Sequence, residues 1–214
     1  MNCSDNTAPR PGRYHHGNLR DALIVAAAEL IEENASIGFA MIDAARKAGV
    51  SSAAPYRHFK DKDALLEAVS ELAFLGLTIT TRDTALKYPA GSEQRIIAIG
   101  KAYISYVISH RAFYDLMWGD MGLRGFEAAD IDIKTSGFRV LVESVQLWCD
   151  GLGLVDYNAL ELSVKLWAMG HGLACLAMNH HLEQFLPDVD VFSLLESSTR
   201  TFFEGLKRTK SRPE

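Results

Sequence analysis

The side chains best suited to catalysis or metal binding are His171 and Cys175, whose four-residue spacing places them on one face of a helix. Two more histidines, His180 and His181, stand side by side. A metal site or an activated nucleophile needs a third ligand or a base, and no Asp or Glu lies within one turn of His171. We therefore predict a protein that is not an enzyme and holds no metal or cofactor.

The three cysteines, Cys3, Cys149 and Cys175, are too few and too scattered for a disulfide framework. Their odd number and the lack of a secretory leader predict a reducing, cytoplasmic location. A redox-sensing role for Cys149 or Cys175 is an alternative, although both lie in apolar helical stretches where thiols are usually inert. The longest apolar tract, Leu166 to Met178, is shorter than the roughly 18 residues of a membrane span, so no membrane partner is expected.

Positive charge is concentrated locally, although the chain of 214 residues has a formal net charge of -5. Residues 1–63 hold eight Lys/Arg and eight Asp/Glu, so the negative balance lies in the remainder. Residues 46–62 contain five cations and one acid, and residues 10–20 contain three arginines and no acid. Local potential steers a polyanion more than the net charge does. A charge run is more often a solvated face, so this pattern alone only points toward nucleic acid.

The basic stretch coincides with two short helices separated by a tight turn. Gly49 ends a helix over residues 41–48, because glycine readily takes the left-handed conformation past a helix end. Ser51 or Ser52 then caps a helix that runs through Phe59 or Lys60. With Ser52 as the cap, Pro55 is the third helical residue and breaks no hydrogen bond. The pattern predicts a helix-turn-helix, which offers its second helix to the DNA major groove, although many all-α proteins contain similar pairs.

Helical periodicity dominates the rest of the chain and predicts an all-α fold. A first helix covers residues 19–31, and Asp61 caps a fourth helix that runs from Lys62 into the late 70s or beyond. After a linker at 88–92, further helices are expected over 93–110, 132–149, 157–179 and 191–207, with an irregular stretch at 118–130. Residues 14–62 would form a basic three-helix head, and residues 63–210 a larger, acidic helical body. The 157–179 helix is apolar around nearly its whole circumference, so it must be buried on every side.

Three segments resemble the tetracycline-repressor (TetR) family of bacterial regulators. They are "IDAARKAGVSSAAPYRHFKDKDALLEAV" in the basic stretch, "RYHHGNLRDALIVAAAELIEE" before it, and "LWAMGHGL" near the C-terminus, which is similar to a Trp-His-Gly signature of one branch. The resemblance implies a homodimeric transcriptional regulator, a repressor, that binds a palindromic double-stranded DNA operator. It also implies that a small-molecule effector, here apolar or aromatic, releases the operator.

The resemblance assigns the DNA-binding residues, whereas the effector and dimer residues are expected from the apolar and aromatic pattern of the body. For DNA binding they are Arg13, Ser51, Ser52, Ala53, Tyr56, Arg57, His58 and Lys62. For the effector we expect Tyr103, Tyr106, Met117, Trp118, Phe138, Trp167 and His171, although a lone histidine on an apolar helix is more often a core residue. For the dimer interface we expect Leu173, Leu195, Phe202 and Phe203, with core packing as the alternative. One departure from the family is Ala40, which stands where a Ser or Thr usually caps the second helix.

Overall fold

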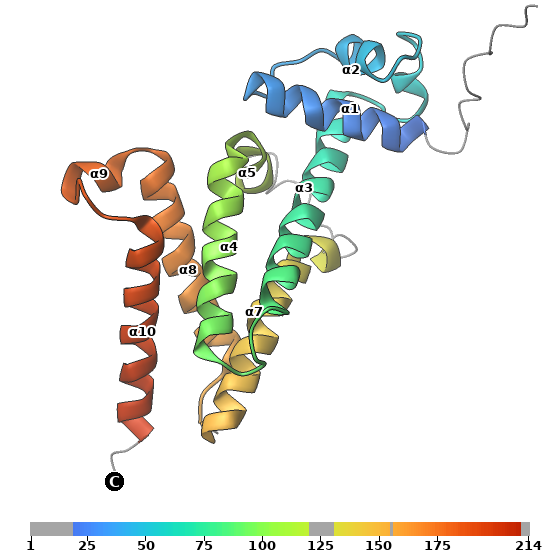
Figure 1. The fold of residues 1–214 in the computed structure, drawn as a ribbon. Helices are drawn as coiled ribbons and strands as arrows, with labels where there is room; N and C mark the ends of the chain where they lie inside the picture. Colours follow the sequence, from blue (N-terminus) through green and yellow to red (C-terminus); the bar gives the residue numbers. More distant parts are fainter. Residues whose placement is uncertain (1–18, 120–130, 155, 211–214) are drawn as a thin grey trace, which may run out of the picture.

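The computed structural model describes residues 19–119, 131–154 and 156–210, and within these residues every regular element is a helix (Figure 1). The predicted all-α fold is therefore confirmed. The helices in chain order are α1 (Leu19–Asn34), α2 (Met41–Lys47), the short 3₁₀ helix η1 (Pro55–Arg57), α3 (Lys62–Ala85), α4 (Glu93–Ser109), α5 (Arg111–Trp118), α7 (Ile131–Leu152), α8 (Ala159–Met178), α9 (His181–Phe185) and α10 (Val191–Lys210).

The head consists of α1, α2 and η1, which lie across the N-terminal end of α3 (Figure 1). The stripe predicted on the first helix faces inward, since Leu23 and Ile31 are fully buried. They meet Ala44 of α2 and Leu65 of α3 in one hydrophobic core. That core continues without interruption into the body, so head and body are packed against each other rather than joined by a loose linker.

The helix α3 is the longest element and belongs to both parts of the molecule. Asp61 caps it as predicted, accepting a hydrogen bond from the Ala64 N–H at 2.8 Å. The helix continues for 24 residues, to Ala85, in agreement with the expected end in the late 70s or beyond. By length and composition it could cross a membrane, but half of its most apolar window is buried inside the protein, as in the core helix of many proteins without a membrane span.

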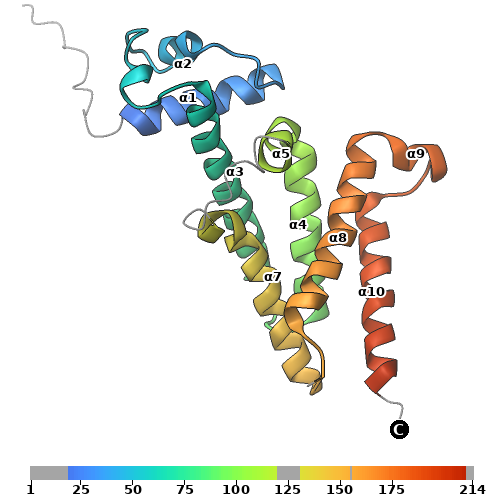
Figure 2. The ribbon, with the colours of Figure 1, turned by 180° about the vertical axis from the view of Figure 1, so that it is seen from behind.

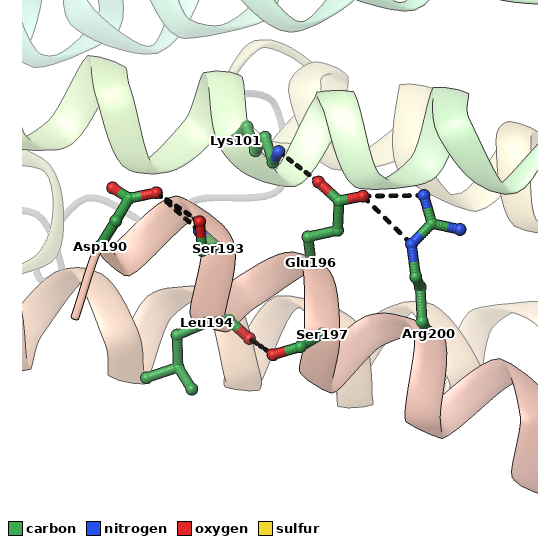
Figure 3. Close-up of polar contacts among 7 residues, drawn as sticks. All are labelled: Lys101, Asp190, Ser193, Leu194, Glu196, Ser197 and Arg200. Carbon is green, nitrogen blue, oxygen red and sulfur yellow. Dashed lines mark hydrogen bonds and ion pairs between the residues drawn. The ribbon is translucent and has the colours of Figure 1, made fainter.

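The body is a bundle in which α3, α4, α7 and α8 pack together and α10 lies along α4 and α8 (Figures 1 and 2). Polar contacts fix α10 in place (Figure 3). Lys101 of α4 forms an ion pair with Glu196 of α10, and Arg200 donates two hydrogen bonds to the same carboxylate. Asp190 caps α10 by accepting from the backbone and the hydroxyl of Ser193.

Two expectations about the last helices need correction. Leu195 and Phe203 are buried inside the protomer, 2% and 1% exposed, and Phe203 packs on Trp148 with ring centroids 4.5 Å apart. These two side chains are therefore core residues of the protomer and not, as predicted, part of a dimer interface. The α8 helix is not buried on every side within the protomer, because Leu160 and Val164 are 53% and 45% exposed. Phe202 and Leu173 are half-buried.

The burial of Phe203 predicts a large loss of stability on truncation. Phe203→Ala should lower the free energy of unfolding by about 3–5 kcal/mol, because it removes the transfer free energy of the ring and leaves a cavity. Chemical denaturation measures this. Phe202→Ala, which truncates the half-buried neighbour, should cost clearly less. Equal losses for the two variants would contradict this assignment of Phe203 to the core.

Candidate nucleic-acid interface and ligand cavity

The turn between α2 and η1 has the geometry that the sequence predicts. Gly49 has a φ of +70°, in the left-handed region, and the Val50 N–H bonds the Ala45 carbonyl at 2.9 Å to close the end of α2. The side chain of Val50 packs against the head core. At the other end of α2, Asp43 accepts a hydrogen bond from the backbone N–H of Ala40 at 2.9 Å. That contact supplies half of a capping box without the usual Ser or Thr.

The segment after the turn is not the regular α-helix that was expected. Ser52 and Ala53 form a turn, and only Pro55–Arg57 are helical, in a single 3₁₀ turn that begins after Ala54. Pro55 is thus the first residue of this helix, not the third. The bonds Ala54 N–H to Ser51 C=O and Arg57 N–H to Ala54 C=O span three residues, as in a 3₁₀ helix. Proline has no N–H to give to Ser51, so the α-helical bond at this position cannot form.

Most of the predicted DNA contacts form one exposed surface around η1. These side chains are Ser51, Ser52, Ala53, Tyr56, Arg57 and His58. Tyr56 is 61% exposed, which is unusual for a large aromatic residue with no packing role. Phe59, by contrast, is buried and anchors the segment in the head core, with the Arg20 guanidinium 5.4 Å from its ring centroid. Arg13 lies outside the described residues.

The cations of this region divide into paired and unpaired groups. Lys47 bridges to Glu33 and Glu29 of α1 at 2.7 and 3.2 Å, so it fastens α2 to α1. Lys62 donates to the Ile37 carbonyl at 2.6 Å and lies over the Phe39 ring. Arg57 and Lys60 are exposed and form no ion pair with any described residue. The free positive charge therefore lies beside Tyr56, where a phosphate backbone can reach it.

The body contains a partly open cavity of about 260 Å³ between α3, α4, α5, α7, α8 and α10. Four predicted effector residues line it: Tyr103, Trp118, Phe138 and Trp167. Three others do not. Met117 is fully buried in the core. The Tyr106 hydroxyl donates to the Ala73 carbonyl of α3 at 2.8 Å, and Tyr106 does not line the cavity. Burial raises the pKa of Tyr106 to about 12.

His171, the third, lies behind the cavity wall as the centre of a hydrogen-bonded chain. Its Nδ1 is 2.7 Å from the Tyr103 hydroxyl and its Nε2 is 3.1 Å from the Tyr114 hydroxyl, which also lies 2.8 Å from Cys175 Sγ. Burial lowers the pKa of His171, so the ring is neutral at pH 7 and one nitrogen donates while the other accepts. Burial also raises the pKa of Tyr103 and of Tyr114, which keeps both hydroxyls protonated.

Two family models match the chain. Residues 23–69 match the bacterial regulatory proteins of the tetR family, and residues 96–201 match the tetracyclin repressor-like C-terminal domain. The chain belongs to the TetR family. Members are DNA-binding transcription regulators rather than enzymes, and this chain is a DNA-binding regulator of that kind. The more specific assignment to a Trp-His-Gly branch stays a prediction.

Solved structures agree with the TetR fold. A protein of unknown function from Rhodococcus sp. RHA1 is 30% identical with a TM-score of 0.75, over 91% of this chain and 98% of that one. A putative transcriptional regulator from Pseudomonas aeruginosa PAO1 is 18% identical with a TM-score of 0.67, over 92% and 93%. The TetR family regulator PfmR from Thermus thermophilus is 18% identical with a TM-score of 0.52, over 83% and 94%. No curated protein matches.

Several residues that line the cavity of this TetR protein were not predicted from the sequence. Hydroxyl groups come from Thr78 and Thr81 of α3 and from Thr199 of α10, and small wall positions come from Gly100, Gly137 and Gly170. A threonine in a helix carries no sign of which neighbour it faces, so no sequence signal marks these residues. Of the cysteines, Cys149 is buried and its pKa is raised by that burial, which disfavours the reactive thiolate.

The lowered pKa of His171 predicts a loss of stability on acidification. Below the ordinary value of 6.5 the unfolded chain binds a proton at this ring before the folded chain does, so stability falls as the pH drops from there through the lower folded-state pKa. Above 6.5 both states are neutral and this contribution stays constant. His171→Gln should remove this part of the decline between about pH 7 and about pH 5, measured by urea denaturation. The control His181→Gln, at an exposed position, should keep it, and an unchanged decline in His171→Gln would contradict the assignment.

Proposed function

We propose that this TetR-family regulator is a cytoplasmic homodimeric repressor that binds a near-palindromic operator and leaves it when a small, uncharged, apolar or aromatic molecule enters the cavity. The observation that carries the proposal is the sharing of α3. Leu65 and Val69 of this helix are buried in the core shared with the head, and Leu77 and Thr81 of the same helix line the cavity. A ligand that moves the cavity wall therefore moves the surface around η1.

The DNA contacts are proposed to divide by role. Ser51, Ser52 and Ala53 are small and exposed, so they let the head approach the major groove closely. Tyr56 and His58 would bond backbone phosphates, which set the register of the protein on the duplex. One of the three N–H groups of Lys62 donates to the Ile37 carbonyl, so two remain for a phosphate. Two heads related by a two-fold axis would read half-sites roughly 34 Å apart or a small multiple of that distance.

Arg57 is the free cation best placed to contact DNA, and its removal tests the interface. With an operator selected from a random DNA pool, Arg57→Ala should weaken binding about tenfold or more, because a charge-assisted hydrogen bond contributes about 1.5–3 kcal/mol. Fluorescence anisotropy over a range of salt concentrations measures this. A salt slope that flattens by about one assigns Arg57 to a phosphate, and a changed base preference assigns it to a base edge.

A matched control for this measurement is Arg82→Ala. Arg82 is also exposed but lies toward the C-terminal end of α3, far along the helix from the head. The control should bind the operator like the unaltered protein. Full affinity in Arg57→Ala would remove this residue from the interface.

The dimer is proposed to form through exposed faces of α8 and α10. Along α8 the side chains exposed at every fourth position are apolar or small: Leu160, Val164, Ala168, Gly172 and Leu176. Along α10 the corresponding exposed series is Ser193, Ser197, Thr201 and Gly205. An apolar helix face left open to water is costly, and small residues let helices approach closely. Pairing the α8–α10 face with its two-fold copy would complete the burial that the sequence of α8 requires.

Gly172 offers a clean test of this dimer. A Cβ atom at Gly172 would meet nothing within 4 Å in the protomer, and glutamate favours a helix more than glycine does. Gly172→Glu should therefore leave the protomer folded but place a charge in the middle of the proposed interface, giving monomers in sedimentation. Gly151→Glu in α7 makes the same change at an equally open position and should stay dimeric. A dimeric Gly172→Glu protein would place the interface elsewhere.

A further inference from the structure

One wall residue of the cavity carries a hydrogen-bond donor that no described residue satisfies. The indole nitrogen of Trp118 is buried and has no hydrogen-bond partner among the described residues. Trp118 is also part of the cavity lining. A buried N–H without an acceptor loses its hydration without compensation, and such groups are rare enough that each calls for a physical explanation.

The aromatic neighbours of Trp118 cannot supply the acceptor. Ring centroids of Phe74, Trp167 and His171 lie 5.2, 5.5 and 5.8 Å from that of Trp118. Phe74 has no acceptor atom, and the indole of Trp167 is only a donor. Both nitrogens of His171 are already taken, by the hydroxyls of Tyr103 and Tyr114. The hydrogen-bonded chain behind the wall is therefore closed, and Trp118 is left out of it.

Two threonines that line the cavity use their hydroxyl hydrogens inside the protein. The Thr78 hydroxyl donates to the Phe74 carbonyl and the Thr81 hydroxyl donates to the Leu77 carbonyl, both within α3. The hydrogen of each of these two hydroxyls is therefore used within α3. No Lys, Arg, Asp, Glu or His is among the described residues that line the cavity, so a charged ligand would lose its hydration without a counter-charge from them. The 260 Å³ volume lies just below the range of about 300–1,000 Å³ for drug-sized ligands.

We propose that Trp118 selects the ligand of this cavity. The ligand is a small, uncharged, mainly hydrocarbon molecule that carries a neutral acceptor oxygen, such as the carbonyl of a ketone, ester or lactone. The indole nitrogen is buried in this structure, so the ring turns toward the cavity when its N–H donates to that oxygen. This inference rests on the proposed effector function and narrows its chemistry. A hydrocarbon of the same shape fills the cavity but leaves the donor unpaired, so it binds more weakly.

A hydrogen bond from Trp118 to a ligand could also affect the head, because α5 connects the two. It is the last residue of α5, and the residue preceding the first turn of that helix is His110. The Nδ1 of His110 lies 2.6 Å from the carboxylate of Glu32 in α1. A ligand oxygen that draws Trp118 toward the cavity therefore acts on a helix whose other end contacts the head.

The test uses a matched pair of bicyclic probes, 1-tetralone and tetralin, which differ in one carbonyl group. Isothermal titration should show tetralone binding about tenfold tighter than tetralin, as one net hydrogen bond allows. In Trp118→Phe, which keeps an aromatic ring but loses the donor, the two affinities should agree within about twofold. Trp148→Phe, the same change at a buried tryptophan outside the cavity, should keep the preference. A tetralone preference that survives in Trp118→Phe overturns the proposal, as does failure of tetralone to bind the unaltered protein.

A second measurement needs no variant. In the unaltered protein the indole ¹H–¹⁵N signals of the tryptophans are followed during titration, and one of them should shift downfield with tetralone and not with tetralin. The absence of any such shift overturns the proposal even if Trp118→Phe fails to fold. Operator binding is measured separately with each probe. A Trp118-dependent preference without operator release would leave this inference standing and reject the proposed release mechanism.

Discussion

The continuity of α3 is the constraint on which the rest of the structure depends. Its first turns complete the core of the head, and its later turns form a wall of the cavity. The helix runs without a break from Lys62 to Ala85, so a displacement of one region is passed along it to the other. The close approach of α4 reinforces this, because a Cβ at Gly76 would lie 2.7 Å from the Tyr106 hydroxyl. Glycine at this position lets Tyr106 bond the α3 backbone directly and ties the two helices together.

The polar groups of the body are arranged so that the cavity stays uncharged. Tyr103, His171, Tyr114 and Cys175 bond one another, and burial keeps the imidazole neutral and the phenols protonated. Breaking one of these buried hydrogen bonds would leave a polar group without a partner, which costs free energy. The chain therefore holds α4, α5 and α8 rigidly together. The described residues that line the cavity are apolar apart from Tyr103, Trp118 and three threonines, Thr78, Thr81 and Thr199. These lining residues restrict the chemistry of a ligand more than the volume of the cavity does.

Charge is distributed over the molecule in keeping with a regulator that presents only its head to DNA. The negative balance of the chain lies beyond residue 63, and the unpaired Arg57 and Lys60 lie beside the exposed Tyr56. The acidic body is repelled by the phosphate backbone while the head is attracted, so encounter with DNA is oriented before specific contacts form. The exposed apolar stripe on α8 carries only small and aliphatic side chains, which suits a partner of the same kind.

The sequence by itself determined the helical fold, the Asp61 cap and the Gly49 turn, because these depend on neighbours in the chain. Asp61, Gly49 and the periodicity of α1 each act within a few residues, and each is found as predicted. Whether an apolar side chain faces core, cavity or solvent depends on elements distant in the chain. That is why Phe203 and Leu195 proved to be core residues, why Met117 and Tyr106 do not line the cavity, and why Thr78 and Thr81 were missed. The indole N–H of Trp118, which has no hydrogen-bond partner among the described residues, is likewise a result of tertiary packing, because its neighbours come from α3 and α8.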